Sequence, residues 1–160
     1  MRTLIIKFTI QKFTLARVMN NYEVVMDNKI SSSKEIARKI VAVLIEKKAL
    51  DVKLFKTDEQ NPVCDYYVNA TGRSSTQVGS LADEVCYQLS LDGVNELRVE
   101  GRNGKSWLLV DYGDVIVNVF DRQSREFYDL DRLFTKETEI DITDIISEVD
   151  NKLNVNIEEK

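Results

Sequence analysis

The segment 63–100 decides the fold of this chain, and its sequence is VCDYYVNATGRSSTQVGSLADEVCYQLSLDGVNELRVE. Residues 63–70 are rich in β-branched and aromatic side chains, which predicts a strand that ends at Thr71-Gly72. Ser74 is followed three residues later by Gln77, a capping-box pattern that starts a helix. The apolar residues of that helix recur at the spacing of one helical face: Val78, Leu81, Ala82, Val85, Cys86 and Leu89. Gly93 closes the helix and a strand at 97–100 follows, so the segment predicts a strand, a helix and a strand joined as a parallel crossover.

Upstream of this segment the sequence predicts one more helix and one more strand. Ser32 and Glu35 form a second capping-box pattern, and apolar residues at helical spacing follow over about 33–48. Residues 51–56 alternate between polar and apolar side chains, which is typical of a half-buried strand. Residues 57–62 are expected to form a polar turn between this strand and the next.

Downstream, glycine-containing turns at 101–104 and 112–114 separate strands predicted at 97–100, 107–111 and 115–120. Turns of this kind join consecutive antiparallel hairpins. Asp121 is suited to cap a last helical stretch that reaches Leu133-Phe134. We therefore expect an α+β fold, a single domain with a five-stranded mixed β-sheet flanked by helices.

The two ends of the chain differ in charge from each other and from this domain, which we place at 31–134. Residues 1–30 begin with four bases and no acid before Glu23, and we interpret them as an N-terminal extension that is either dispensable, an organellar transit peptide, or a structured element. Residues 135–160 carry eight acids against three lysines and form an acidic C-terminal tail. Its isoleucines at 142, 145 and 146, with Val149 and Leu153, could form an amphipathic helix.

Composition narrows the classes of function. The chain has 160 residues, a net charge of -5 and no His, which excludes Ser-His-Asp and Cys-His catalysis and His-ligated zinc. Its two cysteines, Cys64 and Cys86, lie in no CxxC pair, and Cys86 falls on the apolar face of its helix, where we expect a packing thiol. An acidic chain is unsuited to bind nucleic acid by charge alone, so its partner surface is expected to be basic. No run of residues is apolar enough for a membrane span.

An enzyme can be assembled from three pieces of the sequence. The loop Thr71-Gly72-Arg73-Ser74-Ser75 precedes a helix and could hold a phosphate, Asp111 and Asp114 could bind Mg²⁺, and Arg102 could pair with an anion. Together they would suggest phosphoryl or nucleotidyl transfer. The loop lacks the spacing of a P-loop, however, and serine at a helix start or aspartate beside glycine in a turn has a conformational explanation that we favour.

The strand predicted at 107–111 is apolar on both faces. Alternation places Trp107, Leu109 and Asp111 on one face and Leu108, Val110 and Tyr112 on the other. If helices cover only one face, the other presents an aromatic anchor beside carboxylates, as protein-binding surfaces do. If helices cover both faces, Trp107 belongs to the core. The residues alone leave both interpretations open.

Several motifs together resemble the Iojap-type ribosomal silencing factor family, RsfS, from about Ser33 to Phe134. In chain order they are Asp65-Tyr66-Tyr67-Val68, Ala70-Thr71-Gly72, Arg73-Ser74, Gln77-Val78, Val99-Glu100-Gly101, Trp107, Asp111-Tyr112-Gly113-Asp114-Val115-Ile116-Val117, and Phe127-Tyr128-Asp129-Leu130 before Leu133. The chain departs from the family at Asn118, where many members carry His, and in the polar loop at 58–61.

The resemblance implies a translation repressor and not an enzyme. Members of the family bind the fourteenth protein of the large ribosomal subunit and block joining of the small subunit when nutrients are short. Their fold resembles that of nucleotidyltransferases, but family members lack the catalytic motif. The resemblance therefore implies a function that needs neither cofactor nor metal. The partner-binding residues would be Trp107, Leu109, Asp111, Tyr112 and Asp114.

The resemblance also bears on other partners and on location. It implies a homodimer as a possible free form, no direct reading of nucleic acid and no membrane contact. We expect the protein in the cytoplasm, or in an organelle if residues 1–30 are a transit peptide.

Overall fold

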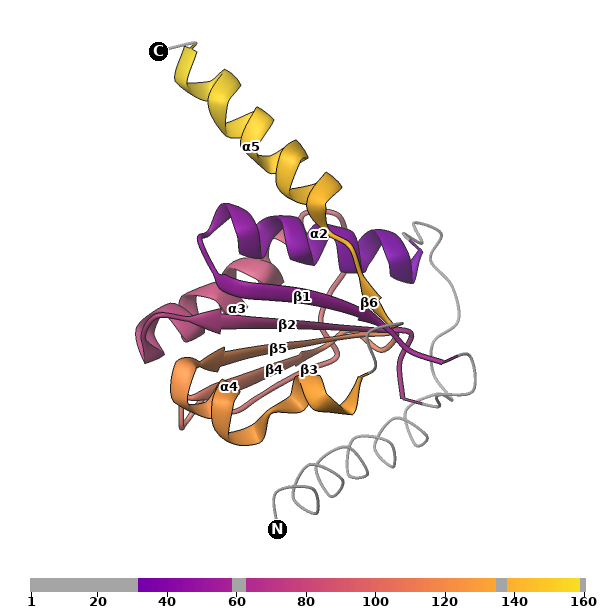
Figure 1. Cartoon of the computed structure of the whole chain (residues 1–160), viewed down its shortest axis with the longest axis vertical. Helices are drawn as coiled ribbons and strands as arrows, with labels where there is room; N and C mark the ends of the chain where they lie inside the picture. The colour runs from indigo at the N-terminus through magenta and orange to yellow at the C-terminus, as the bar shows by residue number, and fades with distance from the viewer. Residues whose placement is uncertain (1–31, 59–62, 135–137, 159–160) are drawn as a thin grey trace.

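This computed structural model describes residues 32–58, 63–134 and 138–158, and Figure 1 shows their arrangement. The extension expected at 1–30 lies outside the described residues, as does most of the loop at 58–61. Among the residues described, no helix has both the length and the apolar character that crossing a bilayer requires.

One mixed sheet forms the centre of the molecule, as the sequence predicts. Its strands are β1 (Leu50–Lys56), β2 (Tyr66–Gly72), β3 (Arg98–Glu100), β4 (Trp107–Asp111), β5 (Val115–Asp121) and β6 (Glu139–Ile140). They lie in the order β3-β4-β5-β2-β1-β6. Only β2 and β5 pair in parallel among these strands; the other pairings are antiparallel. The crossover from β2 to β3 is parallel in direction, but β4 and β5 lie between the two strands.

The sheet has six strands in the described residues, which corrects the five predicted. The additional strand, β6, pairs with the outer edge of β1 through Leu54 with Ile140 and Phe55 with Glu139. The edge of β1 offers unpaired backbone groups that a passing extended segment can satisfy. Because two residues are too few for alternation to be visible, the sequence carries no signal for this strand.

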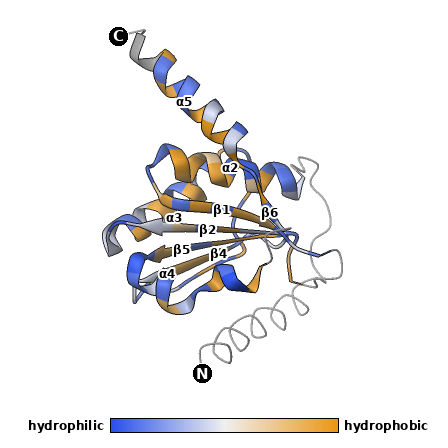
Figure 2. Cartoon of the chain, in the orientation of Figure 1, coloured by the Kyte–Doolittle hydropathy of each residue, from blue (hydrophilic) through white to orange (hydrophobic). Residues whose placement is uncertain are grey.

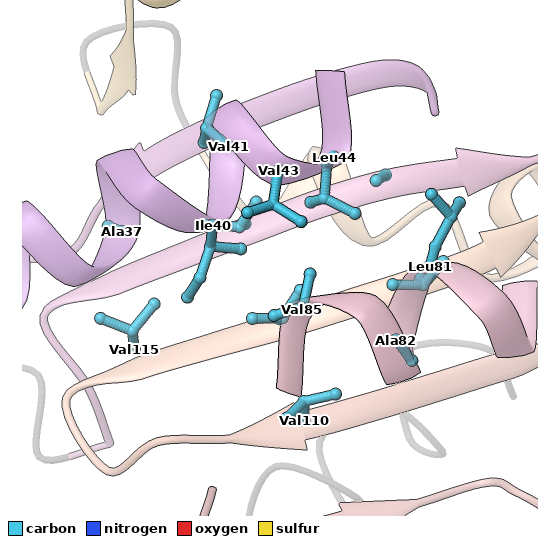
Figure 3. Close-up of a cluster of buried hydrophobic side chains, with 14 of the residues drawn as sticks. Ala37, Ile40, Val41, Val43, Leu44, Leu81, Ala82, Val85, Val110 and Val115 are labelled. Carbon is cyan, nitrogen blue, oxygen red and sulfur yellow. The ribbon is translucent and has the colours of Figure 1, made fainter. Parts of the chain in front are cut away.

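Two helices, α2 (Ser33–Glu46) and α3 (Ser75–Ser90), form the helical layer that covers one face of the sheet and encloses the main core. A third helix, α5 (Thr143–Glu158), packs against α2 and adds Ile145 to this core. Side chains from α2 and α3 meet Val110 and Val115 of the sheet in Figure 3. The helix starts follow the predicted caps, since the side chains of Ser32, Ser74 and Asp121 each accept a backbone N–H of their helix. On the opposite face lie the short helix α4 (Arg122–Tyr128) and a 3₁₀ turn, η1 (Leu130–Leu133).

The acidic segment forms the predicted amphipathic helix, α5, and its first half packs against α2. Ile145 is 2% exposed and joins the main core, and Val149 is 5% exposed. Arg38 of α2 bonds Asp144 at 2.7 Å, and this hydrogen bond lowers the pKa of the Asp144 carboxyl. The end of α5 projects past the body (Figure 1), and hydrophilic and hydrophobic residues alternate along it (Figure 2). Residues 139–149 therefore complete the packed unit, which differs from the domain boundary predicted at 134.

Replacing Ile145 with alanine is expected to lower the free energy of unfolding by about 3 kcal/mol, because a buried isoleucine leaves a cavity when it is truncated. The adjacent Ile146 is 39% exposed and provides the matched control, so its replacement with alanine should cost about 0.5 kcal/mol. Urea unfolding of both variants measures the difference. Equal losses would show that α5 does not contribute to the core.

Candidate functional site

The two faces of the sheet are covered differently, and this difference determines what β4 presents. Leu108 and Val110 point into the core beneath the helices, whereas Trp107 and Leu109 lie on the opposite face, as alternation predicts. We call that opposite face the second face. It is covered by α4, η1 and Phe134 and not by a full helical layer, so the structure lies between the two interpretations that the sequence left open.

Trp107 is partly buried and is held on three sides. Its ring stacks on Phe120 with centroids 5.0 Å apart and lies 4.7 Å from the ring of Tyr128. Its indole N–H donates to Oδ1 of Asn118 at 3.0 Å. Phe127 continues the aromatic group, with an edge-to-face contact on Tyr128 and 46% of its surface exposed. We call Trp107, Phe127 and Tyr128 the aromatic surface.

Leu109 lies beside this surface but is 6% exposed. It packs in a cluster with Phe55, Tyr67 and Ile116, and Phe134 covers the cluster by stacking on Phe55 at 4.4 Å. The side chain of Leu109 therefore supports the second face from within.

Tyr112 is separated from Trp107 and Leu109 by the sheet. Its side chain packs against the main core, and burial, followed by the proximity of Cys86, raises the pKa of its phenol. Burial also raises the pKa of the Cys86 thiol, which agrees with the packing role predicted for this residue. The structure does not bring Tyr112 together with the other predicted partner-binding residues.

Asp111 and Asp114 occupy the turn that connects β4 with β5, and they differ in exposure. Asp111 is 8% exposed, and its carboxylate accepts the backbone N–H of Gly113 at 2.7 Å and lies 3.6 Å from the guanidinium of Arg98. Asp114 is exposed. Asp111 therefore holds the turn, while Asp114 presents its carboxylate at the surface.

The pieces of the enzyme hypothesis lie at opposite ends of the sheet. Tyr66 pairs with Val115 and Gly72 pairs with Asp121, so the turn with Asp111 and Asp114 is at the start of β2 and the loop 71–75 is at its end. A seven-residue strand separates them by about 20 Å. No group of three or more potential metal-ligating side chains occurs in the part of the chain that the structure describes.

Polar groups of the loop 71–75 form hydrogen bonds with the first turn of α3. The backbone N–H of Arg73 donates to the side chain of Gln77 at 2.7 Å, and that of Gln77 donates to Ser74 at 3.2 Å. A Cβ at Gly72 would lie 2.8 Å from the side chain of Val78, so glycine allows strand and helix to approach closely. Arg102, the third piece, pairs with Asp83 of α3 at 2.8 Å. The contacts of the loop are those of a structural helix start, and Arg102 is paired within the protein.

Two buried amides on the second face were not among the predicted site residues, although the sequence analysis noted one of them, Asn118, as a departure from the family. Asn69 is fully buried and Asn118 is 1% exposed, and they pair across β2 and β5. The available signal was a polar residue inside a run of strand formers, as in Val68-Asn69-Ala70 and Val117-Asn118-Val119. Alternation along a strand indicates which face such an amide occupies, but it indicates no partner for it.

Comparisons with known proteins agree with this fold and with the resemblance in the sequence. Residues 30–159 match the family described as "Ribosomal silencing factor during starvation". A ribosomal silencing factor of Bacillus subtilis (strain 168) is 32% identical over 103 residues, which are 64% of this chain and 87% of that protein. An Iojap-related mitochondrial protein of Arabidopsis thaliana is 30% identical over 101 residues, covering 60% of this chain and 54% of that protein. A crystal structure of a Chromobacterium violaceum protein superposes with a TM-score of 0.62 at 32% identity and covers 64% of this chain and 86% of that one.

Proposed function

Because this chain belongs to the family of ribosomal silencing factors, we propose that it binds the large ribosomal subunit at its fourteenth protein and blocks joining of the small subunit. Occupying the face of the large subunit that meets the small one would lower protein synthesis when nutrients are short. The relatives are named as silencing factors and not as enzymes, which supports a regulatory role.

The observation that carries the proposal is the aromatic surface on the incompletely covered second face. Trp107 and Tyr128 are partly buried, and Phe127 adjoins them with nearly half of its side chain in solvent. Aromatic residues that are anchored on one side and accessible on the other are common at the centres of protein interfaces. We propose that Trp107 is the principal contact with the ribosomal protein.

We assign supporting roles to three of the predicted partner-binding residues. Leu109 packs behind the second face, Asp111 holds the turn, and Tyr112 fixes β4 against the helical layer. Asp114 is the acid of this group that is placed to meet a basic partner. A net charge of -5 also favours a basic protein over the RNA backbone as the landing site.

We further propose that the free protein can form a homodimer, and that no cofactor, metal, membrane or direct reading of nucleic acid is involved. The bacterial relative and the mitochondrial one support association with ribosomes of a bacterial cytoplasm or of an organelle.

Sedimentation of purified bacterial subunits tests the proposal. The protein is expected to co-sediment with the large subunit and not with the small one, and to reduce the joined fraction when added to the large subunit before the small one. A control adds the protein after joining, which should have less effect because the site is then covered. Joining that proceeds unchanged at saturating protein would contradict the proposal.

Replacing Asp114 with lysine is expected to slow association with the large subunit by about five-fold at low salt, because exposed charges steer a partner of opposite sign. The difference should shrink at high salt, where the Debye length is shorter. Glu46→Lys makes the same change in net charge at the exposed end of α2, in the helical layer, and serves as the control. Stopped-flow association rates at two salt concentrations measure the effect. Equal slowing by both variants would indicate that net charge, and not the place of Asp114, matters.

A further inference from the structure

A chain of hydrogen bonds crosses the second face and ends at Trp107. The indole N–H of Trp107 donates to Asn118 at 3.0 Å, the amide N–H of Asn118 donates to Oδ1 of Asn69 at 3.0 Å, and the amide N–H of Asn69 donates to Oδ1 of Asp131 at 2.8 Å. The four residues come from β4, β5, β2 and η1. These hydrogen bonds therefore link the aromatic surface, through β5 and β2, to η1.

The two ends of this chain give it a direction. An indole N–H can only donate, and an ionised carboxylate can only accept. Each asparagine between them must then accept with its oxygen on the Trp107 side and donate with its nitrogen on the Asp131 side. Turning over either amide would place a donor against a donor or an acceptor against an acceptor in a buried setting, which is unfavourable. The orientation of both amides is thus fixed.

The carboxylate end of the chain is itself held in place. Oδ2 of Asp131 accepts from the guanidinium of Arg125 at 2.8 Å, and Lys53 lies 3.6 Å away. Arg125 is 8% exposed and also donates to the hydroxyl of Thr71 at 3.2 Å. Because a buried guanidinium that is bonded on two sides has little freedom, Asp131 is a rigid anchor.

We infer that Asn118, Asn69 and Asp131 are positioning residues that fix the orientation of the Trp107 ring for docking. This inference rests on the proposed function, in which Trp107 is the principal contact. Stacking on Phe120 and Tyr128 restrains the tilt of the ring, and the bond to Asn118 determines which edge of the indole turns inward. A side chain that is held in its bound orientation loses less entropy on binding, so the positioning residues raise affinity without touching the partner.

The composition of the chain allows a direct measurement, because Trp107 is its single tryptophan. A ¹⁵N-labelled sample gives one indole N–H resonance, whose position and exchange with solvent report on the bond to Asn118. In Asn118→Leu the resonance should move upfield and exchange about five-fold faster, which corresponds to the loss of one hydrogen bond. In Asn69→Leu, which does not touch Trp107, it should move in the same direction by less. Affinity for the large subunit should fall by about five-fold in Asn118→Leu and by a smaller factor in Asn69→Leu.

Val117→Ala is the matched control, since Val117 is a neighbour of Asn118 on β5 and points into the main core. It should lower stability to thermal unfolding while leaving the indole resonance and the affinity at their original values. Where Asn118→Leu does not fold, Asn118→Ala replaces it, because the shorter side chain introduces no clash.

Two results would overturn the inference. One is an indole resonance that does not change in either asparagine variant, and the other is a loss of affinity no greater than that of Val117→Ala. Failure of the proposed function looks different, because the unaltered protein would then show its indole resonance in the bonded position and yet not bind the large subunit.

Discussion

Replacing Trp107 with alanine is expected to weaken binding to the large ribosomal subunit by about thirty-fold or more, since truncation of a central aromatic contact commonly costs about 2 kcal/mol. The ring is partly exposed on the second face and is anchored by contacts with the rings of Phe120 and Tyr128 and by the bond from its N–H to Asn118. Removing it leaves the aromatic surface without its centre. Co-sedimentation over a range of subunit concentrations measures the change.

Two further variants separate binding from stability. Trp107→Phe keeps a ring on Phe120 and Tyr128 but loses the indole N–H, so it should fold and show an intermediate affinity. Tyr87→Ala removes a 58% exposed aromatic from α3, in the helical layer, and should bind as the unaltered protein does. If Trp107→Ala is folded by circular dichroism and binds normally, the docking surface lies elsewhere. If it is unfolded, Trp107 belongs to the core.

Replacing Gly101 with alanine is expected to lower the free energy of unfolding by about 3 kcal/mol or more, through backbone strain together with overpacking. Gly101 has a φ of +91°, a backbone conformation that residues with a side chain rarely adopt. A Cβ added at Gly101 would lie 2.0 Å from the carbonyl oxygen of Trp107. Because that contact is with backbone, relief requires β4 to shift at its first residue. The variant should therefore also weaken binding to the large subunit.

Gly104 lies in the same turn and provides the control for this prediction. A Cβ there would have 3.9 Å to its nearest neighbour, the side chain of Ser106, so Gly104→Ala should change stability by about 0.5 kcal/mol or less. Urea denaturation of the two variants under the same conditions compares them. A loss in Gly104→Ala as large as that in Gly101→Ala would mean that flexibility of the turn, and not the close approach to Trp107, explains the effect.

Much of the fold could be predicted because its signals are local. A serine or aspartate that accepts an N–H two or three residues ahead starts a helix whatever surrounds it, and Ser32, Ser74 and Asp121 do so in the structure. The hairpins follow from glycine-containing turns. Alternation likewise separated Trp107 from Leu108, because successive side chains of a strand always point to opposite faces.

The candidate site was less accessible to this kind of reasoning. Trp107 and Asp114 were recognised as residue types suited to an interface, but the exposure of each depends on what covers it. Leu109 was placed on the correct face, yet Phe134 buries its cluster from a segment 25 residues further along the chain. An aspartate such as Asp111 can either contact a partner or stabilise a turn. Only the structure shows that its carboxylate bonds the backbone of the turn.

The sequence by itself determined the helix starts, the alternation of the strands, the mixed sheet and the membership of a family. Each of these depends either on residues close together in the chain or on motifs that follow one another in a fixed order. The tertiary structure alone decided three other features. It paired β6 with the edge of β1, placed the loop 71–75 and the turn at Asp111 at opposite ends of β2, and connected Trp107 to Asp131 through two buried amides. These depend on contacts between residues up to 86 positions apart, from Leu54 to Ile140. No local pattern specifies such contacts, since the partner of a strand edge or of a buried amide is whichever group the packed chain brings within hydrogen-bonding distance.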